Sequence, residues 1–191
     1  MSYEEKVIRY FKNKGPENTD STLELAKRRA LELGIKDIVV ASSHGNTARR
    51  ALEVFKGFNL VVVTISMGFK EEGWTMDPSE RDALVAMGAK VLTCTHALGD
   101  DVDSSFSGRS GARSHKEVVA ETLRRFSQGT KVAVEISMMA ADAGLIEEGK
   151  EVIAIAGTDE GADTALVLKS VCPRRFLELE IREIIAKPRR P

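Results

Sequence analysis

The residue types best suited to binding chemistry stand in the segment from Ser42 to Thr47, which reads Ser-Ser-His-Gly-Asn-Thr. The segment precedes an expected helix, whose first N–H groups lack partners and together carry about half a positive charge. Gly45 would let the backbone approach an anion without a Cβ, while Ser43, Asn46 and Thr47 would donate further hydrogen bonds. The segment therefore predicts a phosphate cradle. A structural alternative stays open, because Ser43 or Asn46 could simply cap the helix.

A second candidate binding segment runs from Gly157 to Thr164 and reads Gly-Thr-Asp-Glu-Gly-Ala-Asp-Thr. Its glycines and threonines offer convergent backbone donors after a buried strand. The carboxylates of Asp159, Glu160 and Asp163 would repel a bare phosphate. We expect them to point away, to cap a turn, or to contact sugar hydroxyls or the edge of a flavin-like ring. A Mg²⁺ role is disfavoured, since no paired ligand pattern is present.

The three histidines and one glycine-rich loop are the remaining candidates. We interpret His44 as a ligand contact, His96 as a weaker one and His115 as the start of a helix. Residues 104–113 include two arginines that could close over an anion, although a mobile loop is the favoured interpretation. The sequence contains no hydrolase elbow and no metalloenzyme motif, so it predicts no metal site and leaves any catalytic residue unknown.

Both binding segments need elements that place them at one edge of a sheet. Short apolar runs alternate with helix-period segments, which is typical of an α/β domain with a largely parallel sheet. Buried strands are predicted over residues 36–41, 60–65, 91–95 and 151–156. Ligands of such sheets collect at the carboxyl ends of the parallel strands, and the two segments follow the first and fourth strands. A further strand over 164–169 follows too closely for a parallel crossover, so it is predicted to be antiparallel.

Helices are predicted from apolar periodicity and from end signals. The first is expected over 3–12, and the second from a capping box of Ser21 and Glu24 to Gly34. Two more are expected to begin after Thr47 and after Asp77. The last two are expected over 115–127, where Gly129 is the stop signal, and over 132–143, where Gly144 is the stop signal. Residues 96–114 show no periodicity and are predicted to form a long surface loop. The chain is expected to end with an edge strand within 176–185 and a solvated basic tail over 187–190.

The residues around both segments resemble a known family. The run Ile38–Arg49, Ile-Val-Val-Ala-Ser-Ser-His-Gly-Asn-Thr-Ala-Arg, resembles the strand, loop and helix of the pyruvate kinase C-terminal domain. Gly144–Gly157, with the following Gly161 and Thr164, is similar to that domain's last parallel strand, glycine-rich loop and antiparallel strand. The resemblance covers about residues 20–170. It implies a single three-layer α/β/α domain with a mostly parallel mixed sheet of five to six strands.

The same resemblance implies what the site would bind. In pyruvate kinases the matched loops hold the phosphate groups of a sugar-phosphate effector. Here His44 stands where a small hydroxyl is common and Asn46 where a basic residue is common, which disfavours a sugar bisphosphate. The catalytic barrel needs ~250 residues, so pyruvate kinase activity is not expected of these 191 residues. The chain is similar to stand-alone archaeal-type members of the superfamily, for which the resemblance implies bound flavin mononucleotide (FMN).

FMN would place its phosphate on the first segment and its ring against apolar residues such as Met67 or Met138. The expected contacts are Ser42, Ser43, His44, Gly45, Asn46, Thr47, Met67, Gly68, Met138, Gly157, Thr158, Gly161, Ala162, Asp163 and Thr164. The first hypothesis is therefore a flavin-binding carrier, sensor or flavin-dependent oxidoreductase. The alternatives are a regulatory or assembly module that binds a sugar phosphate or nucleotide, and a homo-oligomeric structural protein with empty loops.

Composition limits the class of partner. The 191 residues include 28 Lys and Arg against 29 Asp and Glu, a net charge of −1, which gives no global attraction to nucleic acid or to an anionic membrane. No apolar stretch approaches the ~20 residues of a membrane span. Cys94 and Cys172 lack metal-ligand spacing and predict a reducing compartment, so a cytoplasmic location is expected. The expected partner is a phosphorylated small molecule.

Overall fold

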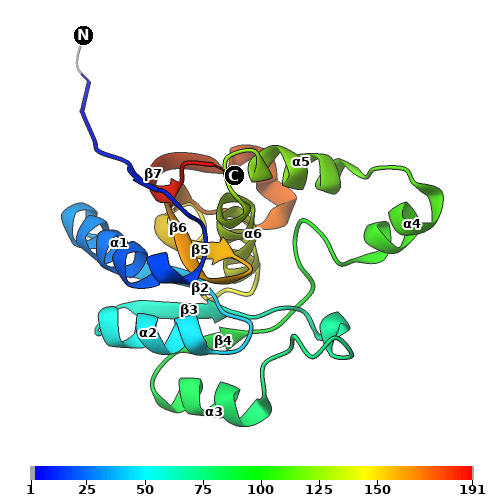
Figure 1. The fold of residues 1–191 in the computed structure, drawn as a ribbon, viewed down its shortest axis with the longest axis horizontal. Coiled ribbons are helices and arrows are strands. Elements are labelled where there is room, and N and C mark those ends of the chain that lie inside the picture. The colour runs from blue at the N-terminus through cyan, green and yellow to red at the C-terminus, as the bar shows by residue number, and fades with distance from the viewer. Residues whose placement is uncertain (1–2, 191) are drawn as a thin grey trace.

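A seven-stranded mixed sheet organises the molecule in the computed structural model, which describes residues 3–190 (Figure 1). The strand order is β1-β7-β6-β5-β2-β3-β4. The strands are β1 (Arg9–Phe11), β2 (Asp37–Ala41), β3 (Asn59–Val63), β4 (Lys90–Leu92), β5 (Glu151–Thr158), β6 (Glu160–Lys169) and β7 (Glu180–Pro188). Within residues 3–190, only the β5–β6 and β6–β7 pairs are antiparallel. The predicted mostly parallel mixed sheet is confirmed, with seven strands instead of five or six.

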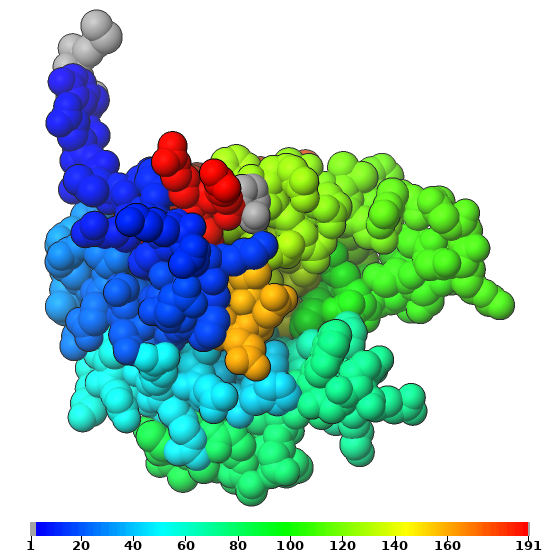
Figure 2. All heavy atoms as spheres, in the orientation of Figure 1, coloured from blue at the N-terminus to red at the C-terminus, as the bar shows by residue number. Residues whose placement is uncertain are grey.

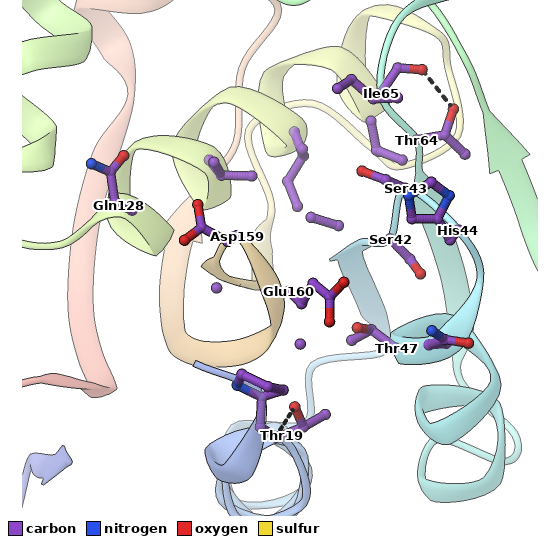
Figure 3. Close-up of a pocket in the computed structure, with 18 of the residues that line it drawn as sticks. Thr19, Ser42, Ser43, His44, Thr47, Thr64, Ile65, Gln128, Asp159 and Glu160 are labelled. Carbon is purple, nitrogen blue, oxygen red and sulfur yellow. Dashed lines mark hydrogen bonds between the residues drawn. The ribbon is translucent and has the colours of Figure 1, made fainter. Parts of the chain in front are cut away.

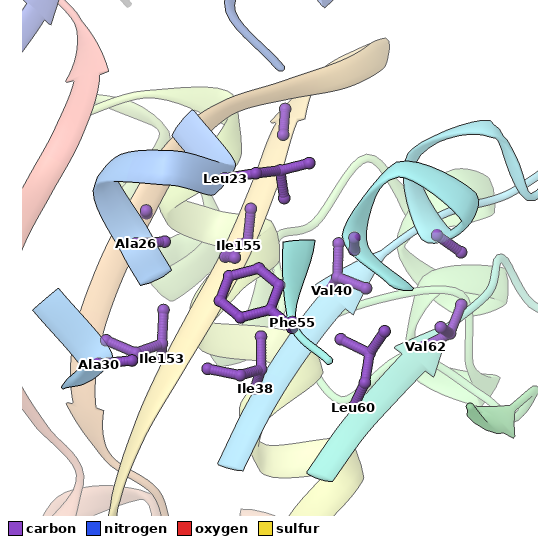
Figure 4. Close-up of a cluster of buried hydrophobic side chains, with 14 of the residues drawn as sticks. Leu23, Ala26, Ala30, Ile38, Val40, Phe55, Leu60, Val62, Ile153 and Ile155 are labelled. Carbon is purple, nitrogen blue, oxygen red and sulfur yellow. The ribbon is translucent and has the colours of Figure 1, made fainter. Parts of the chain in front are cut away.

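Helices cover both faces of this sheet, which confirms the three-layer architecture. One face packs against α1 (Thr19–Leu33), α2 (Asn46–Val54) and α3 (Pro78–Ala86), and the other against α5 (His115–Arg124) and α6 (Gln128–Asp142). Successive residues of β2 serve both layers, since Ile38 and Val40 join the first core (Figure 4) and Val39 joins the second. A strand buried on both faces needs apolar side chains throughout, which explains the uninterrupted apolar runs of the sequence.

The N-terminal region differs from the prediction of a helix over residues 3–12. Arg9–Phe11 instead form β1, which pairs in parallel with residues 186–188 of β7. The predicted Ser21 and Glu24 capping box is also wrong, because α1 begins earlier, with Asn18 at its N-cap and no side-chain cap. A 3-10 turn over Pro16–Asn18 leads directly into the helix. Gly34 ends α1 in the left-handed conformation, with φ 69°, as predicted.

The predicted surface loop over residues 96–114 contains a helix, α4 (Val102–Ser110). The Asp101 carboxylate accepts a hydrogen bond from the Ser104 N–H, and Gly111 ends the helix with φ 69°. None of its residues is buried, and α4 projects from the body of the molecule (Figure 1). Apolar periodicity could not reveal α4, because periodicity reports a helix face that packs on a core.

The boundary between α5 and α6 differs from the prediction. α5 ends at Arg124, and Gly129 lies in the first turn of α6 instead of closing α5. A Cβ at Gly129 would lie 2.4 Å from Thr164 Oγ1, so glycine lets α6 pack closely on the sheet. Phe126, which lies between the two helices, is 48% exposed. The helix predicted over 132–143 is confirmed as α6, and none of the helices within residues 3–190 has the length and apolarity to cross a membrane.

The C-terminal third also needs correction. β5 and β6 are joined through Asp159 alone, so the expected glycine-rich loop after β5 is a tight hairpin. The predicted edge strand within 176–185 begins later, and β7 lies between β6 and β1, inside the sheet. Lys187 belongs to β7 and is 9% exposed, so the basic tail is solvated only from Arg189 on.

Candidate functional site

A cavity of about 500 Å³ opens at the carboxyl edge of the parallel strands. The strand order reverses at this place: the chain proceeds outward from β2 through β3 to β4, then returns to add β5 on the other side of β2. Loops that leave β2 and β5 therefore diverge and create a crevice. The cavity is lined by the segments after β2 and β3, the first turns of α6 and the β5–β6 hairpin, which reaches the surface as the orange patch of Figure 2.

The first predicted segment lies in this cavity. Ser42, Ser43, His44, Asn46 and Thr47 line it, with Ser42 and Thr47 each 6% exposed. Ser42 also caps α2, because its Oγ accepts a hydrogen bond from the Ala48 N–H at 3.2 Å. The capping function that the sequence left open to Ser43 or Asn46 thus belongs to Ser42, and the hydroxyls of Ser43 and Thr47 are available to a ligand (Figure 3).

Gly45 has a different role from the one predicted. It adopts φ 100° at the N-cap of α2, a conformation that favours glycine. A Cβ at Gly45 would lie 2.3 Å from Glu80 Oε1, and Glu80 is held there by Arg49, whose Nη2 lies 2.6 Å from Glu80 Oε2. The open side of Gly45 is therefore filled by α3, and Gly45 does not line the cavity. Its missing Cβ serves packing between α2 and α3 instead of an approach to an anion.

The second predicted segment divides between the cavity and the core. Gly157, Asp159, Glu160 and Gly161 line the cavity. In Figure 3, Glu160 points into the space facing Thr47, whereas Asp159 lies on the side of α6. Asp159 adopts φ 59° at the turn of the hairpin, and both acidic residues line the cavity.

The other residues of this segment hold the hairpin against the start of α1. Asp163 is fully buried, and its Oδ2 accepts a hydrogen bond from the Gly15 N–H at 3.1 Å. The Ala162 N–H donates to Thr19 Oγ1 at 2.9 Å. These contacts fix the position of the cavity wall. Four residues of this segment that were expected as ligand contacts do not line the cavity: Thr158, Ala162, Asp163 and Thr164.

The residues expected beside a flavin ring lie elsewhere. Met67 is 58% exposed on a 3-10 turn after β3, and Met138 is 1% exposed on the buried face of α6. Neither of them lines the cavity, and Gly68 does not line it. Trp74, in the same loop as Met67, stacks on Phe69 with 5.3 Å between ring centroids. The apolar wall of the cavity is formed instead by Ala41, Val63, Ile65, Val132 and Ile136.

One face of α6 contributes polar residues that sequence reasoning missed. Gln128, Lys131, Val132, Glu135 and Ile136 line the cavity at the i, i+3, i+4 spacing of a single helix face. Lys131 Nζ lies 2.5 Å from Glu135 Oε2, and their side chains are only 8% and 3% exposed. The apolar stripe used to predict the helix includes Val132 and Ile136. Charged residues one position before each of them were the signal for a functional face.

His96 brings a second charged pair to the cavity. Its Nδ1 lies 2.5 Å from Oδ2 of Asp100, and the two side chains are 16% and 33% exposed. The His96 ring beside Asp100 holds the pKa of that carboxyl below its usual value, and Lys131 lowers it further. The i, i+4 spacing of these two residues is visible in the sequence, but the loop prediction for 96–114 gave no reason to pair them.

Charges around the cavity nearly balance. Arg50 and Lys131 are the cationic lining residues apart from the histidines, and Glu135, Asp159 and Glu160 are the anionic ones. Arg50 is also in ion-pair contact with Asp20. The N-terminal ends of α2 and α6 border the same space, and each presents partial positive charge. The site can therefore accept one anionic group near the helix ends together with neutral hydroxyl or amide groups.

A comparison with protein-family models identifies the family. The family model described as the pyruvate kinase alpha/beta domain matches residues 20–168. The chain belongs to this family. Among solved structures, the chain is similar to a pyruvate kinase from Cryptosporidium parvum, with a TM-score of 0.42 and 17% identity over 81% of this chain and 24% of that one.

A second structure of the Cryptosporidium parvum enzyme, in complex with ADP, has a TM-score of 0.40 and 18% identity over 92% of this chain and 25% of that one. The alpha/beta domain described here thus spans about a quarter of the length of the pyruvate kinases that it matches.

Proposed function

We propose that this pyruvate kinase alpha/beta domain binds a phosphorylated small molecule, with the phosphate at the N-terminus of α2. The observation that carries the proposal is the state of the first turn of this helix. Ser42 Oγ accepts a hydrogen bond from the Ala48 N–H, and the Gly45 carbonyl accepts one from the Arg49 N–H. The N–H groups of Asn46 and Thr47 have no hydrogen-bond partner within residues 3–190. These donors and the hydroxyls of Ser43 and Thr47 border one cavity. Convergent donors at a helix N-terminus are a common phosphate site.

The charge balance supports a ligand with a single phosphate. Three carboxylates line the cavity against two permanent cations, so a second phosphate would meet net repulsion. Asp159 and Glu160 are placed to accept hydrogen bonds from ligand hydroxyls. Residues such as Ile65 and Ile136 provide an apolar wall for a flat ring.

FMN is the ligand whose parts correspond to these three regions, since it has one phosphate, a hydroxylated chain and a flat ring. The cavity volume of about 500 Å³ lies in the range of small-molecule sites. FMN would supply electron and hydride transfer when bound. The chain's own contribution is to hold the phosphate at α2, accept hydrogen bonds from hydroxyls at the hairpin and exclude water along the apolar wall.

The visible absorption spectrum of the purified protein is the first test, together with mass spectrometry of any small molecule that heat releases. A flavin spectrum with a released mononucleotide is the expected result. A colourless protein is then titrated with FMN, with riboflavin, which lacks the phosphate, and with a sugar monophosphate and a nucleoside monophosphate. Binding of only the last two would retain the phosphate site and assign it to a regulatory module instead of a flavoprotein.

The double variant Ser43→Ala/Thr47→Ala tests the phosphate position. Loss of two hydroxyl donors should weaken FMN binding by ~1 to 3 kcal/mol in total, roughly 5- to 150-fold. Ser21→Ala/Ser105→Ala is the matched control, because both hydroxyls are exposed and lie outside the cavity. Unchanged affinity of the first variant, or equal affinity for riboflavin and FMN, would overturn the phosphate assignment.

A further inference from the structure

We infer that His96 and Asp100 form a proton-transfer pair facing the bound ligand, which makes the cavity a site of acid–base chemistry. The inference rests on the proposed binding function, because it needs a ligand in the same cavity. It adds a property of that ligand: besides its phosphate, the molecule carries an acidic O–H or N–H group at the end that reaches His96.

The first support is the orientation of the imidazole. Nδ1 of His96 lies 2.5 Å from a carboxylate oxygen of Asp100, so Nε2 is the ring nitrogen left for other partners. Within residues 3–190, Nε2 has no hydrogen bond, and His96 lines the cavity. Of the two neutral tautomers of an imidazole, a carboxylate at Nδ1 favours the one with its proton on Nδ1, which leaves a lone pair on Nε2. This is the arrangement that a histidine base requires.

The second support is the scaffold that holds the pair. Asp100 adopts φ 57°, a left-handed turn conformation that Asp accepts more readily than most other residues with a side chain. The turn that contains it is fastened to α6, because the Leu98 N–H donates to Glu135 Oε1 at 2.9 Å. Glu135 is in turn held by Lys131. The buried Lys131–Glu135 pair thus fixes the turn that follows His96, which keeps the imidazole and the Asp100 carboxylate together.

The third support is the charge around the pair. Asp100 stays ionised at neutral pH, since His96 and Lys131 both lower its pKa. The charge of Asp101 raises the pKa of Asp100, which opposes this effect. The negative charge of Glu135 is compensated by its ion pair with Lys131. When a ligand group gives its proton to Nε2, the bonding electron pair stays on the ligand and the resulting imidazolium is stabilised by Asp100. The reverse transfer returns the proton.

The tautomer of His96 tests the pair without any ligand. In protein labelled with ¹⁵N-histidine, long-range ¹H–¹⁵N spectra at pH 8.5 should show the Nδ1–H form for His96. Asp100→Asn should change the tautomer or mix the two forms, because an amide no longer requires a donor at Nδ1. His115→Gln, on the exposed start of α5, is the control that leaves the His96 signals in place. An Nε2–H tautomer of His96 in the unmodified protein would overturn the inference.

Ligand addition tests whether the pair faces the bound molecule. FMN should shift the His96 Nε2 resonance, whereas inorganic phosphate, which reaches only the start of α2, should shift the Thr47 amide and leave His96 unchanged. FMN binding with an unchanged His96 signal would overturn the inference while the proposed function stands. If FMN does not bind, the proposed function fails in its FMN form, and the tautomer measurement decides whether the pair exists.

Discussion

Lys131 and Glu135 show at the scale of single residues how the cavity is held in shape. Both charges are almost completely removed from water, and each one compensates the charge of the other. Glu135 also fastens the turn of Leu98. Buried ion pairs contribute little net stability compared with apolar residues, but removal of one partner leaves a charge without compensation.

Lys131→Met should therefore lower the free energy of unfolding by about 3 kcal/mol. Lys131→Met/Glu135→Gln should recover most of this loss, because a neutral amide oxygen can still accept from the Leu98 N–H. Urea denaturation of the two single variants and the double variant measures the coupling. Additive effects would show that the two charges do not compensate each other in solution.

A comparison of Gly45 with Gly88 distinguishes the energetic cost of a left-handed backbone from the cost of a steric contact at Cβ. They have nearly the same φ, 100° and 101°, but a Cβ at Gly45 would meet Glu80, whereas Gly88 has no atom within 4 Å of that position. Each substitution by alanine should cost about 1 kcal/mol through left-handed strain. Gly45→Ala should cost measurably more, since it also displaces the Glu80–Arg49 pair.

Thermal or urea denaturation of Gly45→Ala and Gly88→Ala checks this difference. Addition of Glu80→Ala to Gly45→Ala should remove the excess, because the space beside residue 45 is then open. Equal destabilisation by the two glycine substitutions would mean that Glu80 moves aside freely and that packing against α3 does not require glycine at position 45.

At the scale of elements, α4 differs from the other helices because it has no buried residue. Its stability must come from its caps and from intrinsic helix propensity. Asp101 satisfies its N-terminus, and Lys116 of α5 is in ion-pair contact with the same carboxylate. α4 should therefore open independently of the sheet and of the helices packed on it.

Gly108→Ala should stabilise α4 alone. A Cβ at this position meets no other atom within 4 Å, and alanine favours a helix interior by about 1 kcal/mol. Hydrogen exchange should show roughly fivefold greater protection of α4 amides, with an unchanged urea midpoint for the whole protein. A shift of the global midpoint would show that α4 unfolds together with the core.

At the scale of the whole molecule, paired or capping carboxylates link stability to pH. The carboxyls with pKa values below the ordinary 3.8 of Asp or 4.5 of Glu include Asp77, Glu80, Asp100, Asp101, Glu117 and Glu180. The unfolded chain binds protons at these groups at higher pH than the folded chain does. The stability they provide is therefore complete above about pH 5 and is lost as the pH falls through the lowered values.

The urea midpoint should fall steadily between about pH 5 and pH 3. Asp100→Asn, which removes one such carboxyl, should be less stable at pH 7 and should lose less stability on acidification. Denaturation at several pH values, with and without high salt, checks both statements, since salt weakens the exposed pairs. A midpoint that rises on acidification would contradict the assignment of these ion pairs.

Much of the fold could be read from local patterns. The strand at 37–41, the helix that ends at Gly34 and the antiparallel direction of β6 each follow from apolar runs, a left-handed glycine stop or a connection too short for a crossover. Residues 42–47 could also be placed at the carboxyl edge, because the strand, loop and helix order is local. Short-range sterics and burial decide such features, so neighbouring residues suffice to predict them.

The remaining features depend on contacts between distant parts of the chain. Arg9–Phe11 form a strand because β7 lies beside them, and Gly45 is needed because Glu80 occupies the space where a Cβ would lie. Asp163 has a structural partner in Gly15, 148 positions away. His96, Lys131 and Ser42 line one cavity because of the order of the strands in the sheet. Local composition contains no information on these distances, so only the packed tertiary structure could establish the cavity and its chemistry.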